Sequence, residues 1–220
     1  MPDTILSPDP TLDEMRAALG AAIPAQAVFD GWSNAALEAA AKTLALDPGH
    51  ARLAFPDGAI GMIDAWYASI DTRLAAAFPP ERIAAMKIRD RIGALIWARL
   101  DLVRPDKQAA RTALALLVRH PAKATKLGWR AADTMWRLAG DTATDLNHYT
   151  KRLTLSAVYG STLLVWLDDE SEGDADTHGF LDRRLADVMR FEQLKTQFKP
   201  DPERQFSVTR LLGRLRYPAT

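Results

Sequence analysis

The stretch "DGWSNAALEAAAKTLALDPGHARLAFPDGAIGMIDAWY", residues 30–67, decides the fold because prolines and glycines cut it into short helical pieces. An Ala-rich segment over residues 34–44 ends before the turn formed by Asp47, Pro48 and Gly49. A short turn of helix is expected at 50–55, followed by a corner at 55–58 and a long helix over 58–78, since Pro and Gly stop or start helices. The stretch therefore predicts short helices leading into a longer one.

The rest of the chain has the same helical character. Apolar residues recur with a 3.6-residue period, and the alternation typical of strands is missing. We therefore expect an all-α protein of about nine or ten helices. Further helices are expected at 13–27, 81–103, 107–119, 122–139, 144–167 and 177–194, with a short tail helix at 208–216. The expected domains are a disordered lead-in (1–12), a helix-turn-helix-like subdomain (13–57), a helical domain (58–194) and a linker with the tail (195–220).

Composition sets the broad class of the protein. The 220 residues are 48% hydrophobic, which is enough to bury a full core. Cysteine is absent, which excludes disulfides, thiolate zinc sites and cysteine nucleophiles. The start "MPDTILSPDPTLDEM" lacks the features of a secretory signal. No apolar run reaches the roughly 18 residues of a spanning helix, so we expect a cytoplasmic protein whose membrane contact is peripheral.

The front of the chain resembles the helix-turn-helix of the TetR family of transcriptional repressors over about residues 13–75. The shared features are an Ala-rich second helix, a turn at 46–49, and an aromatic-Pro-Asp-Gly corner at 55–58 where those repressors carry aromatic-Pro-Ser-Lys. The resemblance implies a TetR-like helical bundle.

The charge of this front does not suit DNA. Residues 1–60 hold three basic and eight acidic residues, a net charge of −5. Phosphate contacts supply most of the affinity for DNA, and the turn before the long helix offers only Arg52, while Asp57 stands where a lysine is usual. We expect a vestigial helix-turn-helix and no nucleic-acid partner. The alternative is a TetR-type transcriptional regulator that responds to a hydrophobic ligand.

Large aromatic and Met side chains are frequent in the middle of the chain. They suit a packed helical core. They equally suit an apolar tunnel for a flexible lipid chain, because Met is adaptable and Trp is wide. The sequence leaves both interpretations open. On the second, the candidate lipid-binding residues are Met62, Trp66, Met86, Ile96, Trp97 and Trp129.

The stretch "WRLAGDTATDLNHYTKRLTLSAVYGSTLLVWLDD", residues 136–169, gathers polar residues between two helices. Gly140 is expected to end the first helix, and Asp141 or Thr144 to cap the second. Asp141, Asp145 and His148 would share one helix face if the helix already included Asp141, but a single Asp-x-x-His falls short of a di-metal set. No metal site, catalytic residue or cofactor is expected, so the chain is not predicted to be an enzyme. The Tyr and Arg side chains left over suit a protein interface.

Together with the following "THGFLDRRLADVM", this stretch resembles the ubiquinone (coenzyme Q) biosynthesis lipid-binding accessory protein family, whose fold is TetR-like. The resemblance runs from about Gly31 to Met189 and rests on the ordered Gly-Asp, Thr-Asp and Tyr-Thr-Lys-Arg elements. It implies a non-enzymatic homodimer that binds an isoprenoid or quinone lipid and presents it to a membrane-bound di-iron demethoxyubiquinone hydroxylase. His148 stands where the family often has Trp. The implied partner-binding residues are Asp133, Met135, Leu138, His148, Tyr149 and Arg152.

The tail "QFSVTRLLGRLRYPAT", residues 205–220, has a cationic amphipathic pattern. A segment this short is too weak a helix alone in water, so an anionic membrane surface is its expected partner. Packing on the body or on a dimer mate is the alternative. The candidate membrane-contact residues are Val208, Leu211, Leu212 and Leu215 on one side and Arg210 and Arg214 on the other.

Overall fold

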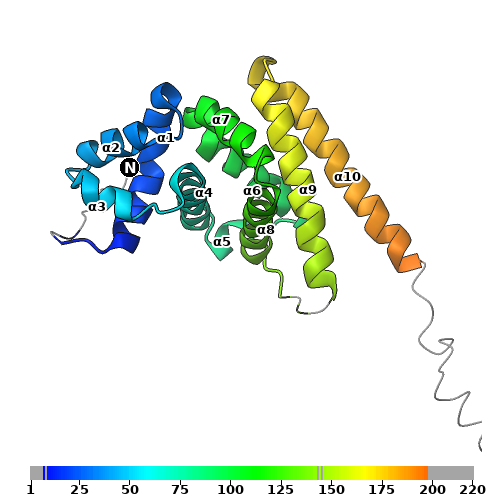
Figure 1. Ribbon diagram of the computed structural model, residues 1–220. Coiled ribbons are helices and arrows are strands. Elements are labelled where there is room, and N and C mark those ends of the chain that lie inside the picture. Colours follow the sequence, from blue (N-terminus) through cyan, green and yellow to red (C-terminus); the bar gives the residue numbers. More distant parts are fainter. Residues whose placement is uncertain (1–6, 8, 143, 145, 198–220) are drawn as a thin grey trace, which may run out of the picture. The chain divides into compact units, whose positions relative to one another are not determined.

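A computed structural model describes residues 7, 9–142, 144 and 146–197 (Figure 1). Within these ranges the chain forms ten α-helices and two short 3-10 helices, which confirms the all-α prediction. It divides into two compact units, residues 1–182 and 183–220, and the last helix crosses the boundary. The expected tail helix at 208–216 lies outside the described residues.

Local capping signals define the three front helices. They are α1 (Leu12–Asp30), α2 (Asn34–Thr43) and α3 (Pro48–Leu53). Thr11 and Glu14 form a reciprocal capping box at α1, and the Ser33 hydroxyl accepts the Ala36 N–H at α2. The Asp47 carboxylate likewise accepts the N–H of His50 at α3. These side chains satisfy N–H groups that have no partner within the helix, which is why each helix begins where it does.

The most extensive packing of the front is between α1 and α4 (Gly58–Ala77). Gly20 of α1 is buried, and a Cβ atom there would lie 2.7 Å from the carbonyl oxygen of Ala65. The two backbones therefore approach closely only because residue 20 has no side chain. Helix α4 also contacts α6, α7 and α8, so it lies at the centre of the first unit.

Apart from the region 80–103, the remaining helices follow the predicted positions within a few residues. They are α5 (Pro80–Ile83), α6 (Ile88–Val103), α7 (Lys107–Val118), α8 (Pro121–Leu138), α9 (Leu146–Asp168) and α10 (Ala175–Gln197), with 3-10 turns at Arg104–Asp106 and Glu172–Asp174. Helices α8 and α9 pack side by side (Figure 1).

The prediction of one helix over 81–103 was wrong, because the chain breaks between α5 and α6. The Arg91 guanidinium donates hydrogen bonds to the carbonyl oxygens of Met86 and Ala84, and to that of Ala139 at the end of α8. The break is stabilised by these bonds, which compensate backbone groups that a continuous helix would have satisfied internally. Helical periodicity carries no sign of this tertiary contact.

Gly140 ends α8 as predicted. Its φ of 89° is left-handed, and its N–H donates to the carbonyl of Arg137 while the N–H of Asp141 donates to that of Trp136. This pair of bonds is the Schellman arrangement, which favours Gly at the left-handed position.

The close approach of α1 and α4 gives a stability prediction. Gly20→Ala should destabilise the protein by about 1–3 kcal/mol, because the new methyl group has to push two packed backbones apart. Gly160→Ala is the matched control: it lies inside α9 with no atom within 4 Å of the added Cβ. It should stabilise by about 0.5–1 kcal/mol through helix propensity. Urea unfolding measures both, and equal effects would contradict the close packing at Gly20.

Candidate functional site

Arg152 on α9 is the centre of a buried ion-pair network. Its side chain is only 2% exposed, and it pairs with Asp133 of α8 at 2.5 Å and with Asp141 at 3.0 Å. Lys151 also pairs with Asp141 at 2.7 Å, and the Asp141 side chain is 4% exposed. The network joins the end of α8, the turn after it and the start of α9.

This network changes the interpretation of the predicted partner residues. Arg152 and Met135 are buried, so neither presents its side chain at the surface of this structure. Asp141, predicted as a helix cap, takes part in ion pairs with α9. The sequence indicated which residues share a helix face, but it could not show that this part of the face turns towards α8. Leu138 and Asp133 are half-buried.

An aromatic patch lies beside this network and consists of Trp129, His148 and Tyr149. The Trp129 ring centre is 6.4 Å from that of His148 and 6.0 Å from that of Tyr149, and the last two are 5.2 Å apart. Tyr149 is 59% exposed. Two predicted partner residues thus remain at the surface, and Trp129, predicted to line a lipid site, lies with them.

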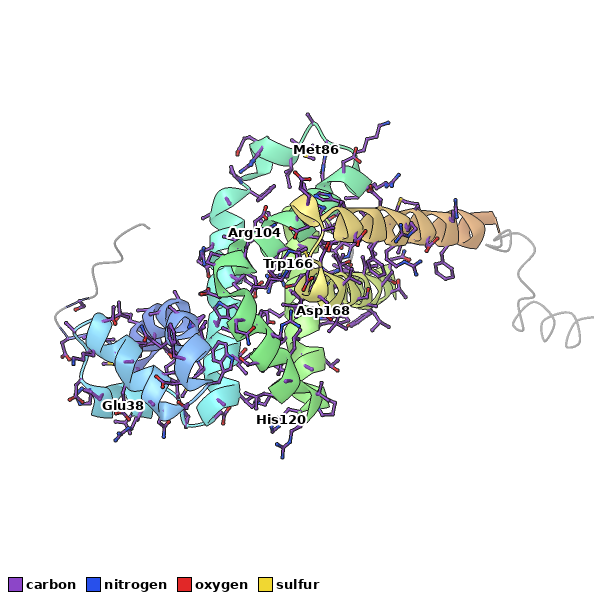
Figure 2. All side chains as sticks on the ribbon, turned by 90° about the horizontal axis from the view of Figure 1, so that it is seen from above. Glu38, Met86, Arg104, His120, Trp166 and Asp168 are labelled. Carbon is purple, nitrogen blue, oxygen red and sulfur yellow. The ribbon has the colours of Figure 1, made fainter. Side chains whose placement is uncertain are left out.

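The other predicted lipid-binding residues fall into separate environments. Met62, Trp66 and Ile96 are almost completely buried, and Trp66 lies 5.3 Å from the ring of Trp32. Trp97 is half-buried and stacks on His178 at 3.7 Å. Met86 lies in the α5–α6 connection at the edge of the first unit, far from Glu38 of α2 (Figure 2). The structure therefore brings Met62, Trp66 and Ile96 into the interior and leaves the other three outside it.

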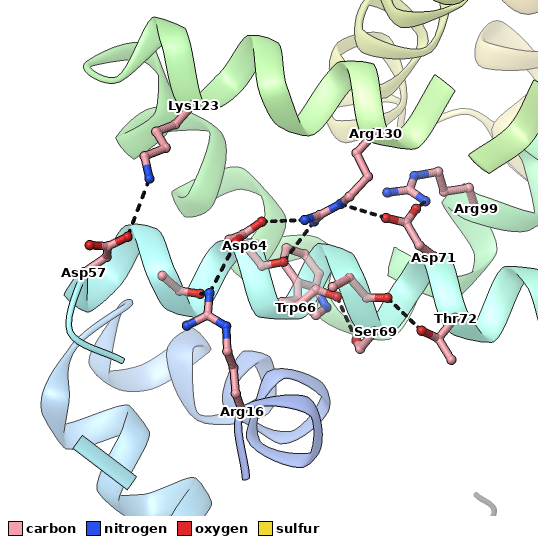
Figure 3. A network of polar contacts seen from close by, with 12 residues as sticks. Arg16, Asp57, Asp64, Trp66, Ser69, Asp71, Thr72, Arg99, Lys123 and Arg130 are labelled. Atoms are coloured by element: carbon pink, nitrogen blue, oxygen red, sulfur yellow. Dashed lines mark hydrogen bonds and ion pairs between the residues drawn. The ribbon is translucent and has the colours of Figure 1, made fainter. Parts of the chain in front are cut away.

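A chain of charged side chains, which was not predicted, runs from the partly exposed Arg16 to the buried Arg99 (Figure 3). Arg16 pairs with Asp64 at 3.2 Å, and Arg130 pairs with Asp64 at 2.6 Å and with Asp71 at 3.1 Å. Arg99 completes the chain by pairing with Asp71. These five residues come from α1, α4, α6 and α8. We call them the central charge chain.

Arg99 is the deepest member of the central charge chain, with no exposed surface. Its Cζ atom lies 5.9 Å from the ring centre of Tyr67 and 5.2 Å from that of Tyr159. Burial opposes its charge, but Tyr159 and Asp71 outweigh burial and raise the pKa of Arg99. Burial also raises the pKa of both tyrosines. The interior therefore holds a charged guanidinium beside two neutral phenols.

The α2–α3 surface presents little basic chemistry. Arg52 of α3 donates through two nitrogens to the carboxylate of Glu38, at 3.1 and 2.5 Å. Its charge is already compensated within the protein. This pairing leaves α3 with less positive charge to offer to a phosphate group than the sequence alone suggested.

Among the residues that the structure describes, no group of three or more His, Asp or Glu side chains is arranged to hold a metal ion. Asp145, the middle member of the metal set weighed above, lies outside them. None of the described helices combines the length and apolar character needed to cross a membrane.

Comparison with known proteins places this geometry in context. The family model of COQ9 matches residues 122–192, which hold α8, α9, the aromatic patch and the Arg152 network. Residues 122–192 are therefore similar to the COQ9 family. The resemblance inferred from the sequence is thereby confirmed for this part of the chain.

Individual relatives extend the similarity. The chain is 29% identical over 182 residues to the human "Ubiquinone biosynthesis protein COQ9, mitochondrial", covering 79% of this chain and 57% of that protein. It is 29% identical over 170 residues to COQ9-B of Xenopus laevis, covering 72% and 57%. The rat protein is 42% identical over 71 residues, 32% of this chain. The chain thus spans about half the length of the curated relatives that it matches along most of its own length.

The fold also matches a solved structure. The crystal structure of a TetR transcriptional regulator from Nitrosomonas europaea superposes with a TM-score of 0.60 at 25% identity, covering 78% of this chain and 96% of that one. The prediction of a TetR-like fold is confirmed.

The buried network gives the prediction for this site. Arg152→Ala should destabilise the protein by up to about 3–5 kcal/mol, because it removes the buried cation of the network. Asp141 then keeps only Lys151, and half-buried Asp133 keeps only the exposed Arg137. Arg137→Ala is the control, since Arg137 pairs with the same Asp133 but is 73% exposed. Its removal should cost no more than about 1 kcal/mol, the range for exposed pairs. Thermal and urea unfolding measure both, and a fully stable Arg152→Ala variant would refute a structural role for the network.

Proposed function

We propose that this protein acts in ubiquinone biosynthesis as a non-enzymatic lipid-binding accessory protein. In this proposal it holds an isoprenoid or quinone lipid within the helical body and presents it to a membrane-bound demethoxyubiquinone hydroxylase. The observation that carries the proposal is the match of residues 122–192 to the COQ9 family. Relatives that match most of this chain are named as ubiquinone biosynthesis proteins.

The buried residues Met62, Trp66 and Ile96 are the proposed lipid contacts. They come from α4 and α6, two helices that contact each other at the centre of the first unit. Their side chains are large and apolar, as a site for an isoprenoid chain requires. Met86, Trp97 and Trp129 remain candidates of lower weight, because they lie nearer the surface.

The aromatic patch is the proposed docking surface for the hydroxylase. It combines exposed Tyr149 with His148 and half-buried Trp129, and such aromatic residues carry much of the binding energy at protein interfaces. The Arg152 network joins α8 and the turn after it to α9, so it fixes the two helices that carry the patch.

Membrane contact and assembly belong to the same proposal. The amphipathic tail, with Arg210 and Arg214 opposite its leucines, is the proposed contact with the anionic inner membrane from the cytoplasmic side. A homodimer is the proposed assembly state.

A transcriptional regulator with a hydrophobic ligand is the second candidate, favoured by the structural match to a TetR regulator. The acidic front and the pairing of Arg52 with Glu38 argue against it, because DNA binding needs unpaired basic groups. Nanomolar binding of a specific genomic fragment at physiological salt, with weak binding of unrelated DNA, would favour the regulator.

Lipid content tests the lipid proposal. Organic extraction of the purified protein, followed by mass spectrometry, should yield isoprenoid or quinone lipid in near-stoichiometric amount. Met62→Trp should lower that amount because it fills the buried site, whereas Val118→Trp, at a position that is 80% exposed, should leave it unchanged. Wild-type protein that yields no isoprenoid lipid would reject the proposal and favour a solid core.

Partner binding tests the aromatic patch. Tyr149→Ala should leave the melting temperature unchanged, because the side chain is 59% exposed. It should weaken the hydroxylase complex by about 1–3 kcal/mol, within the range of interface hot spots. Val118→Ala, which is 80% exposed at the end of α7, is the control and should change neither. A pull-down with the hydroxylase that is insensitive to Tyr149→Ala would move the interface elsewhere.

A further inference from the structure

The interior contains buried hydrogen-bond donors without acceptors. The Nε and Nη2 atoms of Arg99 and the hydroxyl of Tyr159 have no partner in hydrogen-bond geometry among the residues that the structure describes, although Tyr159 lies close enough to Arg99 to raise the pKa of the guanidinium. Arg99 has no exposed surface and Tyr159 is 4% exposed, so bulk water does not reach them. Leaving such groups unsatisfied costs free energy, and native proteins rarely do so without a functional reason.

The nearest protein groups cannot supply what is missing. A guanidinium has five N–H donors and no acceptor. A hydrogen bond from Arg99 to the Tyr159 oxygen, with a small shift, would satisfy one N–H and still leave the Tyr159 O–H and a second guanidinium N–H without an acceptor. The ring faces of Tyr67 and Tyr159 stabilise the positive charge, but they do not replace an acceptor for N–H groups that lie in the guanidinium plane. The deficit is one of acceptors.

The central charge chain also lacks negative charge. The central charge chain holds three guanidinium groups, of Arg16, Arg130 and Arg99, against the two carboxylates of Asp64 and Asp71. Asp71 divides its oxygens between Arg130 and Arg99. Tyr67 and Tyr159 remain neutral, because burial raises the pKa of each. The central charge chain therefore carries one positive charge in excess. Arg99 lies at the buried end of this group of side chains.

Apolar side chains adjoin this polar point. Ile96 lies one turn before Arg99 on α6, and residues three apart share a helix face. Leu95 and Leu100 are fully buried on the same helix. A polar group within an apolar interior is the arrangement expected for a ligand with a hydrophobic tail and an oxygen-bearing head.

We propose that Arg99 and Tyr159 form a recognition site for the head group of the bound lipid, to which they donate hydrogen bonds at oxygen acceptors. This inference rests on the proposed lipid-binding function and adds selectivity for the head to it. A quinone carbonyl and a phosphate both present such oxygens. The site selects lipids that carry them over hydrocarbons with the same tail.

The test uses the purified full chain and three probes with one tail: a geranyl-substituted benzoquinone, geranyl phosphate and the geranyl hydrocarbon. Binding is followed by the fluorescence of the protein's tryptophans. At least one of the two probes with a head should bind about tenfold or more tightly than the hydrocarbon, because charge-assisted hydrogen bonds in a buried site are strong. The better probe identifies the head as quinone or phosphate.

Tyr159→Phe removes one donor and keeps the ring. It should lower the affinity for the preferred probe by about two- to tenfold, which corresponds to the loss of a single hydrogen bond, and leave the affinity for the hydrocarbon unchanged. Without ligand, this variant should melt at or above the wild-type temperature, because the deleted hydroxyl has no partner to lose. Leu164→Met, a change at a position of α9 that is 59% exposed, is the control and should alter neither measurement.

Arg99→Met extends the test to the guanidinium and should abolish the preference for a head. Wild-type protein that binds all three probes equally overturns head-group recognition while leaving lipid binding intact. A Tyr159→Phe variant that is less stable but binds as the wild type also overturns it, since the hydroxyl is then satisfied within the unliganded protein. Failure of the wild type to bind any of the three probes rejects the lipid-binding function itself.

Discussion

The pairing of two carboxylates on α4 with arginines from three other helices is the interaction on which the first unit depends. Asp64 and Asp71 are seven residues apart, two helical turns, so they project from the same side of α4. They receive Arg16 from α1, Arg130 from α8 and Arg99 from α6. Burying such charges is costly, and replacing them by apolar groups is often neutral, so net stability is a poor explanation for them. We infer that their value lies in fixing the positions of the helices around α4, since a shift by one turn would leave a buried charge without its partner.

The same logic operates on a smaller scale between α8 and α9. Arg152 is held by Asp133 and Asp141, which come from the end of α8 and the turn after it. This fixes the start of α9, and with it the positions of His148 and Tyr149 beside Trp129. A buried charge network is a more directional support for an exposed aromatic surface than apolar packing, because each guanidinium nitrogen requires an acceptor at a set angle.

Sequence reasoning succeeded where the signal was local. The turn at Asp47, Pro48 and Gly49, the stop at Gly140 and the period of each long helix depend on residues that are close together in the chain. It failed where the decisive contact came from a distant segment. Arg152 and Arg99 look like ordinary surface residues in a helical pattern, since nothing near them in the chain identifies the carboxylates that allow their burial. The break before α6 was missed for the same reason, because Arg91 ties it to the end of α8.

The packing of the front helices explains how the interior of the first unit constrains their arrangement. Arg16 of α1 reaches Asp64 and also donates to the carbonyl oxygens of Ala54 and Gly61, at the corner between α3 and α4. Helix α1 packs along α4 through Gly20, and α2 and α3 pack on α1. The first three helices thus complete the packing around α4 whatever they contact outside. Loss of basic residues from α2 and α3 leaves this packing intact, whereas loss of the helices themselves would expose α4 and remove one arginine from its carboxylates. The fold of the front is therefore constrained by the interior of the first unit, and its surface is not.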